Sequence, residues 1–259
     1  MKVIDVLSYL ENRFPYKLAS DFDYGKIGLT IGSVNDSVKG IICSLDVTYE
    51  VVMEAINKGA NLIITHHPLL FNPITKINPS EEKGKIIYSL IQNNINLISM
   101  HTNMDLGVDG VADSLALAYN LQNSNIYSNQ EEEFIRIGDI NPISLQELII
   151  KTKELFKLDG VRYVGDLNKT IKRMAILGGA GGQESEIRNA INQHCDCYIT
   201  GELKHHLGLY AHHNDIALIE VNHGIEKIVF NKLISDLKRN FPDVNIVYST
   251  FDTDLFKMM

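Results

Sequence analysis

The residues of this sequence that are best suited to chemistry share one position: each follows shortly after a run of apolar residues. These residues are His66, His67, Asp105, Glu202, His223 and Glu226. If the apolar runs are parallel β-strands, their carboxyl ends meet at one edge of a sheet, where open α/β folds bind their ligands. Imidazole and carboxylate groups are ligands of Zn, Mn, Fe and Ni, and the absence of cysteine among them argues against a structural zinc. The pattern therefore predicts a site for divalent metal ions.

The local spacing of these residues allows them to act in pairs. Pro68 favours a turn out of the strand, so the adjacent side chains of His66 and His67 need not diverge. His223 and Glu226 are three residues apart where a helix is expected to begin, which places them on one face and lets them chelate together. Taken singly, a histidine at a strand end is more often structural, and an aspartate there more often caps a helix. The prediction rests on their joint placement.

Two further motifs suggest ligand binding but have simpler explanations. The stretch Gly178-Gly179-Ala180-Gly181-Gly182 matches neither a P-loop nor the Gly-x-Gly-x-x-Gly pattern. It favours a tight turn between a strand and a helix, although such a turn can also present N–H groups to an anion. Cys195 and Cys197 alternate onto one face of an expected strand, and we predict that this face, like Cys43, belongs to the core.

Apolar and amphipathic segments alternate along most of the chain. Strands are predicted at residues 38–45, 61–65, 95–100, 134–139, 171–177, 195–200, 216–221 and 244–249. Helices are predicted at 3–13, 48–58, 81–93, 109–119, 184–193 and 203–211, with one more beginning at Ser144 and another following His223. Glu147, three residues after Ser144, completes a capping box. This alternation predicts an α/β fold whose sheets are mainly parallel or mixed and are flanked by helices.

The chain also contains an internal duplication. Residues 38–65 and 171–200 have the same layout, a strand, a helix and a strand that ends in Ile-Thr. Residues 95–105 can be laid over 216–226 without a gap, which places Asp105 opposite Glu226. So long a period indicates duplicated half-domains. We predict two similar α/β halves, residues 1–127 with His66, His67 and Asp105, and residues 128–259 with His223 and Glu226.

Composition narrows the functional class. The formal net charge of −8 argues against nucleic-acid binding, which normally requires a basic surface. No apolar run approaches the roughly 18 residues of a membrane span, and the N-terminus lacks the apolar segment of a signal peptide. Three cysteines, an odd number, do not make a disulfide framework. We expect a cytoplasmic protein.

Four motifs, in this order, resemble the NIF-three-like family, whose bacterial members are commonly named GTP cyclohydrolase I type 2 homologues. The motifs are residues 64–71 with His66-His67-Pro68, residues 101–105, residues 200–206 and residues 222–227. The family usually has Trp-Asp-Asn-x-Gly-Leu near the N-terminus, where this chain has residues 22–29 without the Trp and the Asn. Some relatives carry an extra domain between the halves, where this chain has only a short polar segment near residues 127–133.

The resemblance implies two intertwined halves, a toroidal homohexamer and a dinuclear centre. The family's metal ligands fall on His66, His67, Asp105, His223 and Glu226. Five ligands leave room for a bridging carboxylate, Glu226 or Asp105, and for water, and Zn, Fe, Mn and Ni are not distinguishable. Two divalent ions against two carboxylates leave positive charge, which suits a small anionic substrate.

We therefore predict a metal-dependent hydrolase of a nucleotide-like substrate, attacking a purine ring carbon or a phosphoester. Glu202 and His101 are the candidates for proton transfer beside the metals. The alternative is a non-catalytic metal-binding, trafficking or regulatory adaptor protein.

Overall fold

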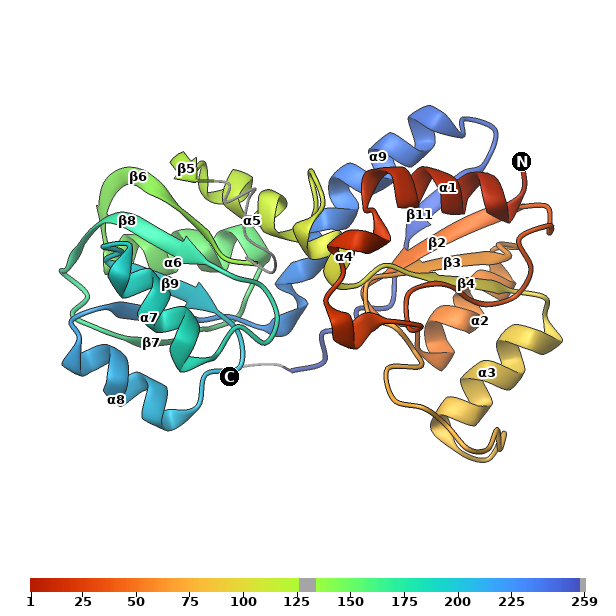
Figure 1. The fold of residues 1–259 in the computed structure, drawn as a ribbon, viewed down its shortest axis with the longest axis horizontal. Helices are drawn as coiled ribbons and strands as arrows, with labels where there is room; N and C mark the ends of the chain where they lie inside the picture. The colour runs from red at the N-terminus through yellow and green to blue at the C-terminus, as the bar shows by residue number, and fades with distance from the viewer. Residues whose placement is uncertain (126–133, 257–259) are drawn as a thin grey trace. The chain divides into compact units, whose positions relative to one another are not determined.

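The structure is a computed structural model that describes residues 1–125 and 134–256 (Figure 1). Its described residues divide into two compact units. The first consists of Met1–Gly110 and Lys227–Thr253, and the second of Val111–Glu226 and the segment that begins at Asp254. The predicted boundary between residues 127 and 128 lies outside the described residues. Within those residues no helix is long and apolar enough to cross a membrane.

The first unit is built on a five-stranded sheet in the order β1-β4-β3-β2-β11. Its strands are β1 (Gly28–Ile31), β2 (Gly40–Ser44), β3 (Leu62–Thr65), β4 (Asn96–Ser99) and β11 (Asn245–Tyr248). All pair in parallel except β1, which is antiparallel to β4. Helices α1 (Val3–Arg13) and α9 (Val229–Asn240) lie on one side of the sheet, and α2 (Tyr49–Asn57) and α3 (Glu82–Gln92) lie on the other (Figure 1).

The second unit is built on a six-stranded sheet in the order β5-β6-β8-β9-β10-β7. Its strands are β5 (Gln122–Asn125), β6 (Arg136–Ser144), β7 (Arg162–Val164), β8 (Thr170–Ile176), β9 (Cys197–Thr200) and β10 (Ala217–Glu220). Its helices are α5 (Val111–Tyr119), α6 (Leu145–Phe156), α7 (Glu184–Asn192) and α8 (His205–His213). The capping box predicted at the start of α6 is present, with Ser144 and Glu147 bonded reciprocally.

The two sheets contain the same four-stranded motif, which confirms the predicted similarity of the halves. Strands β1 to β4 are ordered β1-β4-β3-β2, and strands β7 to β10 are ordered β7-β10-β9-β8, each with a first strand antiparallel to the rest. The registers agree as well. Thr65 pairs with Ser99 in the first motif, and Thr200 pairs with Glu220 in the second, as the ungapped alignment of 95–105 with 216–226 requires.

Each unit has its own core because helices cover the central strands on both faces. The first core gathers β-branched and leucine side chains such as Ile42, Ile63 and Leu97, and the second gathers Ala175, Tyr198 and Leu218. The predicted helices and strands are all present within a few residues of their expected ends. The short strands β1, β5 and β7 and the five-residue helix α4 (Thr102–Leu106), which follows β4, were not predicted from the sequence.

Candidate metal centre

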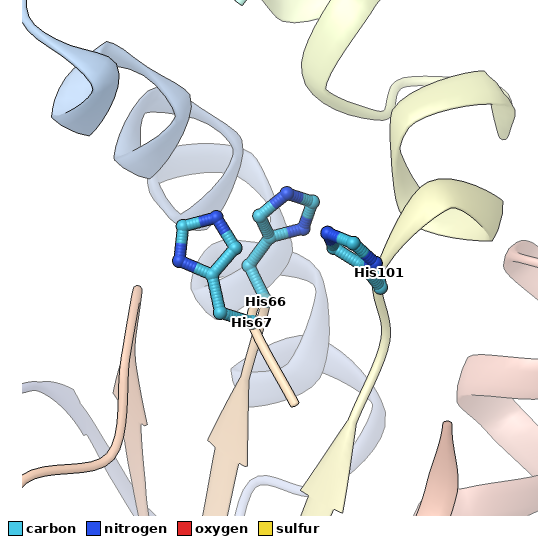
Figure 2. Close-up of side chains that lie close together, drawn as sticks. All are labelled: His66, His67 and His101. Carbon is cyan, nitrogen blue, oxygen red and sulfur yellow. The ribbon is translucent and has the colours of Figure 1, made fainter. Parts of the chain in front are cut away.

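Three histidines meet where β3 and β4 of the first unit end. His66 and His67 follow β3 directly, and His101 follows β4 two residues after its end. Figure 2 shows their imidazole rings gathered above these two strand ends. The ring centroids are 4.8 Å apart for His66 and His67 and 5.3 Å apart for His66 and His101. Each ring offers a nitrogen, and these three nitrogens lie within 4.8 Å of one another, a spacing compatible with metal binding.

The Nδ1 atom of each of these rings is held by an oxygen acceptor. His66 Nδ1 lies 3.1 Å from the carbonyl oxygen of Met100, and His67 Nδ1 lies 2.7 Å from Oδ1 of Asp46. His101 Nδ1 lies 2.8 Å from Oδ1 of Asp23. Carbonyl and carboxylate oxygens only accept, so each Nδ1 carries a proton, and in the neutral ring each Nε2 keeps its lone pair. A hydrogen bond from Nδ1 to an oxygen that is not itself a metal ligand commonly orients metal-binding histidines.

The carboxylates that hold these rings are ionised. Burial raises the pKa of the Asp46 carboxyl, but the hydrogen bonds from His67 and Thr253 and the charge interactions with His67 and His66 together outweigh burial and leave this pKa below its usual range. Asp23 is fully buried, and its pKa is likewise lowered because hydrogen bonds from His101 and Thr102 outweigh the effect of burial. Both groups can therefore serve as permanent acceptors for imidazole N–H groups.

Helix α4 carries Asp105 and brings its carboxylate close to the histidine cluster. Asp23 accepts hydrogen bonds from the backbone N–H and the hydroxyl of Thr102, the first residue of this helix, and so acts as its cap. The helix then places Oδ1 of Asp105 3.5 Å from Nε2 of His66. The first unit thus combines imidazole nitrogens with a carboxylate at one sheet edge.

The second unit gathers a similar group at the carboxyl ends of β9 and β10. Glu202 follows β9 and adopts a left-handed backbone conformation with φ of 57°. His223 and Glu226 lie in η3 (His223–Ile228), the 3₁₀ segment that follows β10. Nδ1 of His223 lies 2.7 Å from Oε1 of Glu202, and its Nε2 lies 3.2 Å from Oε2 of Glu226. The predicted pairing of His223 with Glu226 on one face is therefore present.

The glycine-rich stretch packs against this second group. A Cβ atom at Gly179, where φ is +61°, would lie 2.3 Å from Oε1 of Glu226, and one at Gly178 would lie 2.9 Å from its Cγ. The glycines therefore allow the backbone after β8 to approach Glu226 closely. This accounts for the tight turn that the sequence favoured.

Both groups have the donor set of a metal site. His66 in one unit and His223 in the other have Nδ1 held by an oxygen and Nε2 facing a carboxylate oxygen. A lone pair facing a carboxylate at this distance is repulsive unless a cation or a proton lies between the two atoms. The cysteines take no part, since all three are buried, as predicted, and burial raises the pKa of the Cys43 and Cys195 thiols to about 12.

The structure brings together all the predicted site residues that belong to the same unit. His66, His67, His101 and Asp105 form one group, and Glu202, His223 and Glu226 form the other. Asp46 and Asp23 were not among the site residues predicted from the sequence. Asp46 lies two residues beyond β2, so the rule that selected His66 would also have selected it. Asp23 lies in a short 3₁₀ turn far from any predicted strand, and its signal in the sequence is the Asp of the family motif at residues 22–29, which this chain retains.

Comparison with known proteins gives consistent results. The family model Duf34/NIF3 (NGG1p interacting factor 3) matches residues 1–255. A protein of Clostridium acetobutylicum named GTP cyclohydrolase 1 type 2 homolog is 36% identical over 229 residues, covering 86% of this chain and 84% of its own length. The crystal structure of a Staphylococcus aureus hypothetical protein is similar with a TM-score of 0.91 and 32% identity, covering 100% of this chain and 99% of that one. A Bacillus cereus protein related to NIF3 is similar with a TM-score of 0.92 and 25% identity, covering 100% and 99%.

Proposed function

Since this chain belongs to the Duf34/NIF3 family, we propose that it is a divalent-metal-dependent hydrolase of a nucleotide-like substrate. The single observation that carries the proposal is the shared arrangement of His66 and His223, each with Nδ1 held by an oxygen and Nε2 facing a carboxylate. A neutral structural histidine gains nothing from presenting its lone pair to an anion, whereas a metal ligand requires both features. The relatives' name, GTP cyclohydrolase 1 type 2 homolog, supports a nucleotide-like substrate.

The proposed ligands are His66, His67, Asp105, His223 and Glu226, and they would hold two divalent ions. Five side chains complete two coordination shells only if a carboxylate is shared or water participates, and Glu226 or Asp105 is the proposed shared group. Zn, Fe, Mn and Ni all accept such a nitrogen and oxygen set. When bound, the ions would polarise the substrate and lower the pKa of coordinated water.

The remaining polar side chains would position groups and move protons. His101 has Nδ1 fixed by Asp23 and is the proposed proton carrier in the first unit. Glu202 accepts the Nδ1 proton of His223, so it both orients that ring and can receive a proton from it. The side chain of Glu202 is 57% exposed and therefore accessible to solvent and substrate.

We propose further that the protein acts in the cytoplasm as a homohexamer. The hexamer follows from the family resemblance, and light scattering after size exclusion should then give about six times the 29.1 kDa mass of one chain.

Metal analysis and a turnover screen test the proposed function. Wild type should carry about two divalent ions per chain and should hydrolyse GTP or a generic phosphoester. Glu226→Ala should lose metal and at least about 100-fold in turnover, because it removes a ligand that is 5% exposed. Glu154→Ala, at an exposed residue on α6, is the matched control and should change neither quantity.

Two outcomes would contradict the proposal in different ways. Wild type without metal would exclude the metal centre itself. Two ions per chain without turnover on either substrate class would exclude the hydrolase and favour a metal-binding, trafficking or adaptor role.

A further inference from the structure

Two phenylalanines border the histidine cluster of the first unit. The ring centroid of Phe22 lies 6.2 Å from that of His101, and the ring centroid of Phe71 lies 5.9 Å from it. The two phenylalanine rings are 6.2 Å apart and inclined at 62°, an edge-to-face arrangement. They come from distant parts of the sequence, one from a turn before β1 and the other from the loop after β3.

Both rings are exposed to an unusual degree for side chains of this size. Phe22 is 53% exposed and Phe71 is 38% exposed. Scattered exposed apolar residues need no explanation, but rings grouped at the rim of a polar cluster are typical of ligand sites. The exposed ring surface is therefore available to a flat apolar group that approaches the histidines.

A positive charge lies on the same surface. Nζ of Lys26 lies 4.0 Å from the centroid of Phe71 and 5.9 Å from that of Phe22, which are cation–π distances. Within the described part of the chain, Lys26 forms no ion pair with a carboxylate. The two rings thus hold the ammonium group of Lys26, and its positive charge is available to an anion outside the chain.

We propose that Phe22, Phe71 and Lys26 bind the substrate. One ring stacks on a heteroaromatic base, the other meets the base with its edge, and Lys26 contacts a phosphate. The inference rests on the proposed function and deepens it, since it assigns the recognition of base and phosphate to particular side chains. Stacking on aromatic faces is tolerant of base identity, so this surface selects a nucleotide as a class. The histidine cluster adjoins the rings at His101, which places a stacked base beside the proposed metal ligands.

Charge complementarity favours this occupant over a second copy of the chain. The chain carries a formal net charge of −8, so a second copy would present acidic groups spread over its surface. A nucleotide instead presents one phosphate beside one aromatic base, which matches one ammonium group held against two aromatic rings. Two rings and one ammonium also match one base and one phosphate in extent, while a stable protein interface buries roughly 800 Å² on each side.

A single-tryptophan reporter provides the first test, because the chain contains no tryptophan. In metal-loaded Phe22→Trp, GTP should quench the indole fluorescence through stacking, and inorganic tripolyphosphate should not. Tyr24→Trp is the matched control: Tyr24 is 92% exposed, lies two residues away and has no ring contact with His101 in the described structure. Equal quenching of both reporters, or no quenching of Phe22→Trp at saturating GTP, would overturn the proposal.

Calorimetric titration of the same two probes separates the roles of the rings and the lysine. Phe22→Ala and Phe71→Ala should each weaken GTP binding about tenfold and leave tripolyphosphate binding unchanged. Lys26→Met should weaken the binding of both probes about tenfold, and Tyr24→Ala should weaken neither. If the phenylalanine variants bind GTP normally, or if they change the oligomeric state while GTP binding stays normal, the rings are not a base-binding surface.

Repeating the titrations after chelation distinguishes this inference from the proposed function. GTP binding that depends on Phe22 and Phe71 in a protein without metal or turnover would retain the binding surface and reject the hydrolase. Confirmed metal and turnover with GTP binding indifferent to all three residues would retain the hydrolase and reject the binding surface.

Discussion

At the scale of single residues, the orientation of each histidine is set by one oxygen behind it. Asp46 behind His67 and Glu202 behind His223 are 2.7 Å from their Nδ1 atoms, close enough for a strong charge-assisted hydrogen bond. Such a contact fixes both the tautomer and the plane of the ring. The directions of the Nε2 atoms therefore depend on residues that would never touch a metal.

Asp23 provides a test of this dependence. It is fully buried and accepts hydrogen bonds from His101 and from Thr102, so Asp23→Asn removes a buried anion with three donors around it. We expect the free energy of unfolding at pH 7 to fall by about 2 kcal/mol in urea denaturation. Asp21→Asn, at an exposed residue of the same turn, should stay within about 0.5 kcal/mol of wild type. Equal losses in both variants would mean that the pairing contributes nothing.

The positions of the proposed ligands at strand ends could be predicted from the sequence, and the residues behind them only in part. His66 and His223 each follow a clearly apolar run, and the carboxyl end of a strand is a recognisable position. Asp23 contacts His101 across 78 residues of sequence, and no local pattern reports a contact of that range.

At the scale of elements, the turn after β8 positions the carboxylate of Glu226. The left-handed conformation of Gly179 and its close approach to Glu226 both require the absence of a side chain. A larger residue there would displace the carboxylate of Glu226, and with it the pairing of His223 and Glu226.

A comparison of two alanine substitutions separates these two requirements. Gly59 has φ of +67°, and a Cβ atom added there would meet no other atom within 4 Å, so Gly59→Ala should cost about 1 kcal/mol of stability and leave metal affinity unchanged. Gly179 has a similar φ, and a Cβ atom added there would in addition clash with the carboxylate of Glu226. Gly179→Ala should therefore also weaken metal binding by at least about tenfold. Chelator competition measures the affinity. Equal metal affinity in the two variants would show that the turn does not position Glu226.

Sequence pattern sufficed for elements whose apolar residues recur regularly or form a continuous run, and it failed for β1, β5, β7 and α4. The prediction of α1 at residues 3–13 matches the structure because its apolar residues recur regularly over the whole length of the helix. Strand β7 has three residues, Arg162, Tyr163 and Val164, and exists because it pairs with β10 at the edge of the sheet. Helix α4 has five residues and depends on Asp23 as its cap, so its sequence alone does not specify it.

At the scale of the whole molecule, the chain passes from one unit to the other and back. Helix α9 and strand β11 lie late in the sequence but belong to the first unit, where β11 pairs with β2. The duplication visible in the sequence indicated two halves, and the family resemblance implied that they are intertwined. The return of α9 and β11 to the first unit has no signal in the sequence pattern itself.

Glu54 on α2 holds the segment that follows β11 to the first unit. Its carboxylate accepts hydrogen bonds from the hydroxyl of Ser249, the backbone N–H of Thr250 and the ammonium of Lys58. Burial raises the pKa of Glu54, but these hydrogen bonds outweigh it and bring the pKa from 4.5 down to about 2. Because the pKa is lower in the folded state, the stabilisation is complete above about pH 4.5 and is lost as the pH falls toward 2.

Substitution of Glu54 tests this contribution and its sign. Glu54→Gln should be about 2 kcal/mol less stable than wild type at pH 7, a value reduced for the partial exposure of Lys58, and the difference should shrink at pH 3. Urea denaturation at both pH values measures it. Glu154→Gln on α6 should match wild type at each pH, and a difference for Glu54→Gln that grows on acidification would contradict the assignment.

The repeated four-stranded motif has a consequence for how such a protein can evolve. A single motif that assembles as identical copies must place the same residue after the same strand in every copy, so any useful mutation there is imposed on all of them. Two copies joined in one chain escape that constraint. After β3 this protein has His66-His67, and after the equivalent β9 it has Gly201-Glu202. Because both motifs lie in one polypeptide, their two loops can differ under separate selection.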